Sequence, residues 1–299
     1  MKQILRWVLL ALSIVIASWV ILKILGRGFF SLILVALFVL VFLLSLLLYF
    51  FCDSILLRWY HAKEMRAEKL PLYESVKQLA LKAGVPAPKV YIVDSTVPNA
   101  FATGRSADHA SIVVTNALIE MLDPEELEAV LAHELVHVKH EDTLRGSVVA
   151  VVAGSLTALV TAAFWGSIFT GFGQEDDPAP NFIKFFVTSL VAPVAALLIQ
   201  LMVSESREYR ADEESARIYG KPDKLMSAFE KLEKRLGSNT YNVNPSHVHL
   251  FLINPLHDDE VVVMDFHLPT YHLLFRSHPP TRDRINALRV LQGAEYEGG

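Results

Sequence analysis

Cysteine is nearly absent from this sequence, and so is any excess of positive charge. The single cysteine, Cys52, has no partner for a disulfide within the chain, and we expect it to be an apolar residue at the edge of a membrane. Lysine and arginine number 27 against 32 aspartates and glutamates, which gives a net charge of −5. A nucleic-acid partner is therefore not expected, because proteins of that class gather positive charge.

Charge of either sign is missing from four long stretches, and 53% of the whole chain is apolar. The stretches are 7–22, 28–52, 146–174 and 185–204. Since roughly 20 apolar residues are enough for a helix to cross a bilayer, we predict four transmembrane helices in two hairpins. The first stretch lacks a small-x-small cleavage site, so we interpret it as an uncleaved anchor rather than a signal peptide.

The apolar stretches predict a plan of four parts. These are a first transmembrane hairpin over 1–57, a polar segment over 58–145, a second hairpin over 146–203 and a second polar segment over 204–299. Basic residues flank the polar segments, whereas the turn inside the second hairpin carries Glu175, Asp176 and Asp177. The positive-inside rule then predicts a multi-pass protein of the inner membrane, with both polar segments in the cytoplasm and the bilayer as a partner.

Local patterns in the first polar segment predict helices and short strands. The spacing of apolar residues predicts a helix over Leu72–Gly84, and β-branched residues predict strands over Lys89–Val93 and Ser111–Thr115. Asp123-Pro124-Glu125-Glu126 is typical of a helix start, with Asp123 as N-cap, proline at the first position and Glu126 closing a capping box.

The helix that begins there contains His133-Glu134-Leu135-Val136-His137. Residues four apart share a helix face, so both imidazoles can point at one metal ion. Glu134 is offset by one position and can reach a water on the open side of that ion, which is the H-E-x-x-H pattern of a zinc peptidase. The alternative is a solvated amphipathic helix with two incidental histidines.

A catalytic zinc needs a third protein ligand, and the second polar segment offers one. Glu208 and Asp212 are four apart on a predicted helix, so their carboxylates share a face. We interpret Glu208 as the third ligand and Asp212 as the group that steadies a ligand histidine through its ring N–H. The alternative is an ordinary charged helix face.

These motifs together resemble the HtpX group of the M48 metallopeptidases, which are heat-shock-associated membrane proteases. The resemblance covers nearly the whole chain and includes further blocks in the same order: Asn99–Gly104, Asp142 after the zinc helix, His249-Leu250-Phe251 with Asn254-Pro255-Leu256, and Ser277-His278-Pro279-Pro280 with Arg284-Ile285. One position departs from the family pattern, because Glu205 stands where the family usually has arginine. Arg207 is the nearby residue that can supply that charge.

The resemblance implies an α+β fold: a mainly helical zincin-type metalloprotease domain with a small sheet, assembled from both polar segments. It implies one Zn²⁺ per chain, held by His133, His137 and Glu208, with Glu134 as the catalytic base. It also implies that His278 and Arg284 lie near the zinc and stabilise an oxyanion, and we expect Asn99, Ala100 and Phe101 to lie on an edge strand that pairs with substrate.

The function predicted from the sequence is that of a membrane-anchored zinc endopeptidase acting on misfolded or damaged membrane proteins and unfolded polypeptides. Two alternatives stay open. One is a zinc protease that processes prenylated peptides, although four predicted spans do not favour an enclosed membrane chamber. The other is an inactive membrane scaffold or chaperone, which would have no need of the base Glu134.

Overall fold

The computed structural model of the chain describes residues 23, 29–65, 71–152, 204–238, 243, 245–255, 262–263, 266–267 and 278–297. The first predicted membrane segment and most of the third and fourth lie outside these residues, whereas most of the second lies in helix α2 (Phe29–Trp59). Side chains of α2 are described only in part, and no helix within the described residues is long and apolar enough to cross a membrane. The four membrane helices therefore stay predictions.

Contacts between residues divide the chain into two compact units, Met1–Cys52 and Asp53–Gly299. The four-part plan drawn from the apolar stretches stays a prediction too. The second unit contains the sheet and the helices that carry the candidate site.

A four-stranded sheet in the order β1-β2-β4-β3 forms one layer of this unit. Its strands are β1 (Lys63–Glu64), β2 (Lys89–Val93), β3 (Ala100–Gly104) and β4 (Ala110–Thr115). β2 pairs in parallel with β4, while β1 and β3 run antiparallel to their neighbours. The bounds predicted for β2 are confirmed, β4 begins one residue earlier than predicted, and β1 was not predicted. β3 lies at the edge of the sheet, as expected for 99–104.

The strand β3 ends at a position that only glycine can occupy. Gly104 has a φ of +140°, which side chains disfavour, and a Cβ there would lie 2.3 Å from the carbonyl oxygen of His109. The chain then turns through the 3-10 helix η1 (Ala107–His109) into β4. This tight return fixes β3 antiparallel to β4.

Helices cover the sheet and supply most of the core. They are α3 (Pro71–Ala83), α4 (Asn116–Met121), α5 (Pro124–Lys139), α8 (Glu205–Tyr219), α9 (Pro222–Gly237) and α10 (Thr281–Glu297). Shorter elements are the 3-10 helix η2 (Pro245–Leu250) and the strands β5 (Val262–Val263) and β6 (Phe266–His267). Another helix starts at residue 142 and is described to residue 152.

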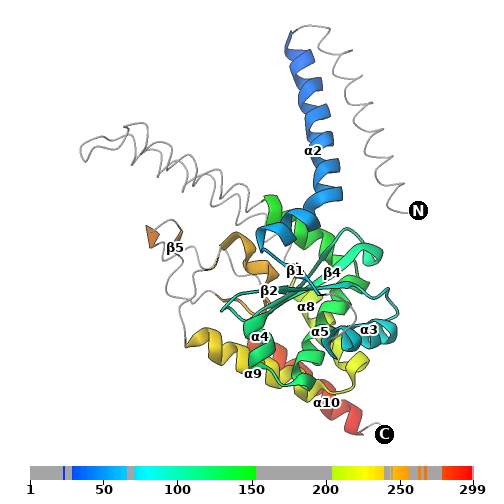
Figure 1. Cartoon of the computed structure of the whole chain (residues 1–299), viewed down its shortest axis with the longest axis vertical. Coiled ribbons are helices and arrows are strands. Elements are labelled where there is room, and N and C mark those ends of the chain that lie inside the picture. The colour runs from blue at the N-terminus through cyan, green and yellow to red at the C-terminus, as the bar shows by residue number, and fades with distance from the viewer. Residues whose placement is uncertain are drawn as a thin grey trace, which may run out of the picture. The chain divides into compact units, whose positions relative to one another are not determined.

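The central helix is α5, which packs against β3, β4, α3, α8 and α9 (Figure 1). Most of its residues are buried, including Leu131, His133 and Leu135, so water is excluded from all but a small part of its surface. The predicted capping box is confirmed, since Asp123 accepts from the backbone of Glu126 and Glu126 accepts from the backbone of Asp123. The mainly helical architecture with a small sheet agrees with the predicted α+β domain.

Candidate metal centre

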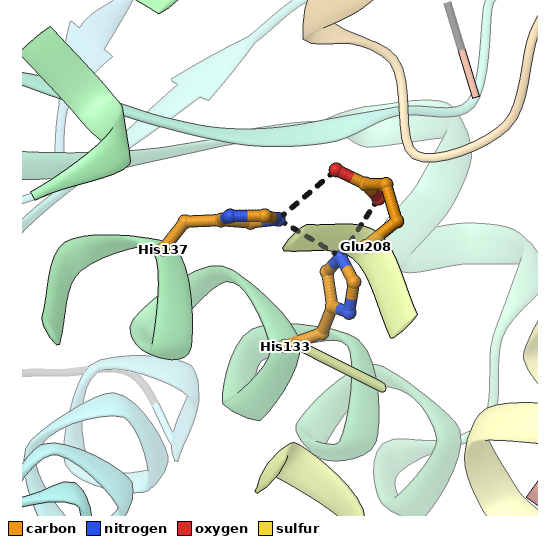
Figure 2. Close-up of side chains that lie close together, drawn as sticks. All are labelled: His133, His137 and Glu208. Carbon is orange, nitrogen blue, oxygen red and sulfur yellow. Dashed lines mark hydrogen bonds and ion pairs between the residues drawn. The ribbon is translucent and has the colours of Figure 1, made fainter. Parts of the chain in front are cut away.

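Two histidines of α5 and one glutamate of α8 converge on a single point (Figure 2). The Nε2 atoms of His133 and His137 lie 3.2 Å apart. Glu208 closes the group, with Oε2 3.7 Å from Nε2 of His133 and Oε1 3.6 Å from Nε2 of His137. One donor atom from each residue lies within 4.8 Å of the others, so the three side chains can reach one ion.

A carboxylate beside each ring fixes which nitrogen of the imidazole carries the proton. Nδ1 of His133 lies 3.0 Å from Oδ1 of Asp212, and Nδ1 of His137 lies 3.4 Å from Oδ2 of Asp142. In the neutral form of each ring, the nitrogen that faces the carboxylate carries the hydrogen and the lone pair is on Nε2. Two lone pairs and a carboxylate that face one another repel unless a cation lies among them, and this donor set therefore fits a metal ion.

The electrostatics of the group keep the carboxylate charged. Burial disfavours the charged form of Glu208, but electrostatic interactions with His278, His137 and Arg284 and a hydrogen bond with His133 outweigh it and hold the pKa of Glu208 well below its ordinary value. Burial also disfavours charge on His133, yet its contacts with Asp212 and Glu208 raise the pKa of this imidazole to about 9 in the metal-free protein. Metal binding would therefore displace a proton from His133.

Glu134 lies in the same pocket and differs from the other carboxylates in its environment. Its surface is only 5% exposed, and burial raises the pKa of its carboxyl group above the usual value, although electrostatic interactions with the neighbouring histidines act in the opposite direction. A carboxylate with a raised pKa is a better acceptor for the proton of a water molecule.

The pocket has walls from both halves of the second unit. The lining residues come mainly from the helices α5 and α8, the edge strand β3, residues 249–252 and the start of the helix at 142. The lining residues are Phe101, Ala102, His133, Glu134, His137, Asp142, Thr143, Arg145, Gly146, Ser204, Arg207, Glu208, His249, Leu250, Phe251, Leu252 and His278. The lining of this pocket is thus partly apolar and partly ionic.

Comparison with protein families matches residues 66–292 to "Peptidase family M48". The match includes all three converging side chains and most of the chain. This chain belongs to peptidase family M48.

Relatives of this M48 protein align with it over most of their length. "Protease HtpX homolog" of Pyrococcus furiosus is 44% identical over 245 residues, which are 81% of each chain. The protein of the same name from Desulfatibacillum aliphaticivorans is 41% identical over 84% of this chain and 77% of its own. That of Thermococcus kodakarensis is 41% identical over 81% of each. The resemblance to the HtpX group of M48 metallopeptidases is thus confirmed.

A solved structure also matches this M48 chain, the crystal structure of S. mikatae Ste24p. Its TM-score is 0.48 at 22% identity, and the match covers 96% of this chain and 64% of that one.

Of the residues expected to act on substrate in this M48 metalloprotease, two line the pocket and two do not. Phe101 and His278 line the pocket, and Nε2 of His278 lies 3.9 Å from Oε2 of Glu208. Asn99 and Ala100 are buried beside it, with 3% and 1% of their surface exposed, and are not among its lining residues.

The side chain of Asn99 binds backbone rather than open space. Its Nδ2 donates to the carbonyl of Leu250, and its Oδ1 accepts from the N–H of Leu252, both at 3.1 Å. Asn99 therefore anchors the 250–252 segment beside the strand β3. Nothing local in the sequence indicates this contact, because its partners lie far along the chain.

Asp142 lies at the candidate site, although the sequence pattern predicted no role for it. It faces Nδ1 of His137, and Nη2 of Arg210 lies 3.3 Å from the same carboxylate. Arg207 contacts it more distantly, with Nε 3.9 Å from Oδ1. The signal available was the spacing, since an acidic residue five positions after a ligand histidine and just past the helix end can turn back to it.

Proposed function

We propose that this M48 protein is a membrane-anchored zinc endopeptidase that hydrolyses peptide bonds of misfolded or damaged membrane proteins in quality control. The observation that carries the proposal is the convergence of His133, His137 and Glu208 on one point with Glu134 beside them. The names of its relatives, each a "Protease HtpX homolog", support hydrolysis of proteins.

The donor set favours zinc among the divalent metals. Two imidazole nitrogens and one carboxylate oxygen are a typical catalytic set, in which a fourth position stays open for water or substrate. His133, His137 and Glu208 would hold one Zn²⁺ per chain, with Asp212 and Asp142 orienting the two rings. Bound zinc supplies a Lewis acid that polarises the scissile carbonyl and acidifies a water molecule.

The chain's own base is Glu134. Its buried carboxylate accepts the proton of the attacking water and later delivers it to the nitrogen of the leaving amine.

Substrate selection depends on β3, which lies at one edge of the sheet. Phe101 and Ala102 belong to this strand and line the pocket, so an extended peptide that pairs with its backbone passes the metal site. Backbone pairing gives affinity with little dependence on side chains, which suits unfolded segments of many sequences.

The proposed location is the inner membrane, with the active site facing the cytoplasm. Its support is the set of four uncharged stretches together with the acidic turn at 175–177 and the basic residues that flank the polar segments.

The substitution Glu134→Gln tests the mechanism. The purified full chain in detergent should keep its zinc but lose hydrolysis of casein or an unfolded membrane protein by about 100-fold or more, because the proton acceptor is gone. Glu125→Gln, a change on the same helix at a side chain that is 45% exposed, is the matched control and should cleave at the wild-type rate. Wild-type turnover in Glu134→Gln would refute the assigned base, and a wild-type protein that binds zinc and cleaves nothing would favour the scaffold.

A further inference from the structure

Arg284 on α10 heads the set of largest fully buried side chains in the described part of the chain, with 1% of its surface exposed. The resemblance implies that this residue stabilises an oxyanion. Its surroundings favour another role, because it is not among the residues that line the pocket. An arginine stays protonated in such a place, so its charge must be balanced by neighbouring groups.

The negative charge that compensates the guanidinium of Arg284 comes mainly from Asp212. Nε and Nη2 of Arg284 donate to the two carboxylate oxygens of Asp212 at 2.8 and 2.7 Å, a two-point pairing of planar groups. Nη1 donates to the carbonyl of Leu252 at 2.8 Å, and the guanidinium carbon lies 4.2 Å from the ring centre of Phe229. The guanidinium is thus held on three sides in a single orientation.

The same carboxylate also contacts a residue of the candidate metal site. Oδ1 of Asp212, which accepts from Arg284, lies 3.0 Å from Nδ1 of His133, whose other nitrogen is one of the three converging donors. Nη2 of Arg284 also lies 3.5 Å from Oε2 of Glu208. Asp212 thus contacts the ring nitrogen of His133 that faces away from the metal donors, and two hydrogen bonds from Arg284 fix the position of Asp212.

We propose that Arg284 is a positioning residue that orients His133 through Asp212 and holds the pocket wall at Leu252, so that metal affinity depends on a side chain that does not touch the metal. This inference rests on the proposed metal site. It links α10 to ligands on α5 and α8, and at Leu252 it meets the same short segment that Asn99 anchors from β3.

The requirement is for arginine and not for positive charge alone. A lysine has one nitrogen and reaches one oxygen of Asp212, which leaves the carboxylate free to rotate. Loss of a partner that orients a metal ligand typically weakens metal affinity or activity by 10–100-fold.

Zinc affinity of the full chain in detergent, measured by competition with a chelator, tests the proposal. Arg284→Lys and Arg284→Gln should each weaken zinc binding by about 10–100-fold. They should also shift the visible absorption spectrum of the Co²⁺-loaded protein, since that spectrum reports ligand geometry. Arg289→Gln is the matched control on the same helix, because Arg289 is 59% exposed and meets only Glu230 among the contacts described. It should bind zinc within about twofold of wild type and leave the spectrum unchanged.

A double-mutant cycle separates positioning from a general effect on the fold. If Arg284 acts through Asp212, then Arg284→Gln should weaken zinc binding much less in an Asp212→Asn background than in the wild type. The double variant removes a buried charge together with its partner, so it remains a folded test case if a single variant unfolds. Equal losses in both backgrounds would overturn the proposal, and so would wild-type affinity and spectrum in Arg284→Lys. No substrate enters these measurements, so a protein that binds zinc without cleaving peptides would refute the proposed function alone.

Discussion

The N-terminus of α5, the helix that carries both histidines, depends on one buried carboxylate. Glu126 is 2% exposed, and its oxygens accept from three donors: the backbone N–H of Asp123 at 3.0 Å, Oγ of Ser227 at 2.6 Å and Nζ of Lys231 at 2.5 Å. The first bond closes the cap, and the other two join α5 to α9. Glu126→Ala removes all three acceptors at once.

The magnitude follows from what each donor loses. The reciprocal cap is worth about 1 kcal/mol, and the bond from Ser227 to a charged acceptor about 1.5–3 kcal/mol. Lys231 is 43% exposed and regains water, so its ion pair adds at most about 1 kcal/mol. We expect Glu126→Ala to lower the free energy of unfolding by about 2.5–5 kcal/mol, which for a unit of this size lowers the melting temperature by roughly 5–20 °C.

The pH dependence gives a second check on the same residue. Burial opposes the charged form of Glu126, but hydrogen bonds from Lys231, Ser227 and Asp123 outweigh it and lower its pKa. A lowered pKa means that the carboxylate stabilises the fold above the unfolded pKa of about 4.3, and that this stability is lost as the pH falls through the folded value. The stability gap between wild type and Glu126→Gln should therefore shrink below about pH 4.5.

Melting in detergent at a fixed scan rate, followed by tryptophan fluorescence, measures these differences. Glu125→Ala is the control, since Glu125 is 45% exposed and pairs with lysines at the surface. Its melting temperature should change by about 2 °C or less. A Glu126→Ala variant that melts at the same temperature as the wild type would show that the capping network contributes nothing to the fold.

Two further predictions concern the metal and the membrane. Glu208→Ala should lose zinc nearly as completely as His137→Ala, because two of three ligands bind too weakly to survive mild chelation, whereas Glu205→Ala, exposed on the same helix, should keep it. Atomic emission gives zinc per protein, and full zinc in Glu208→Ala would exclude this ligand set. A reporter fused within 175–181 should be found outside the cytoplasm and one after Gly299 inside, and the same location for both would contradict the predicted hairpins.

Local signals made parts of the structure predictable. The bounds of β2 follow from β-branched residues after two prolines, and the start of α5 follows from four consecutive residues that form a cap. The shared face of His133 and His137 follows from helix geometry alone. Each of these inferences depends on neighbours within about one turn or one strand.

Contacts between segments far apart in the sequence could not be predicted from such local patterns. Asn99 was expected to lie along the substrate strand, yet its amide binds the backbone of Leu250 and Leu252 because the chain folds back there much later. Arg284 was placed near the zinc by resemblance, but its partner could not be known before α8 and α10 were seen to pack together. A short strand such as β1 has only two residues, too few for any periodic pattern.

The order in which the metal donors are synthesised has a consequence for the living cell. His133 and His137 emerge from the ribosome with α5, Glu208 comes only with α8 after the second uncharged pair of stretches, and Arg284 follows on α10. A nascent chain that has made only the first half holds two of the three proposed donors and lacks Arg284, the residue that we propose orients His133. The proposed active site is therefore incomplete until the second half of the chain has folded onto the first, so a nascent chain cannot cut itself before its synthesis is nearly finished.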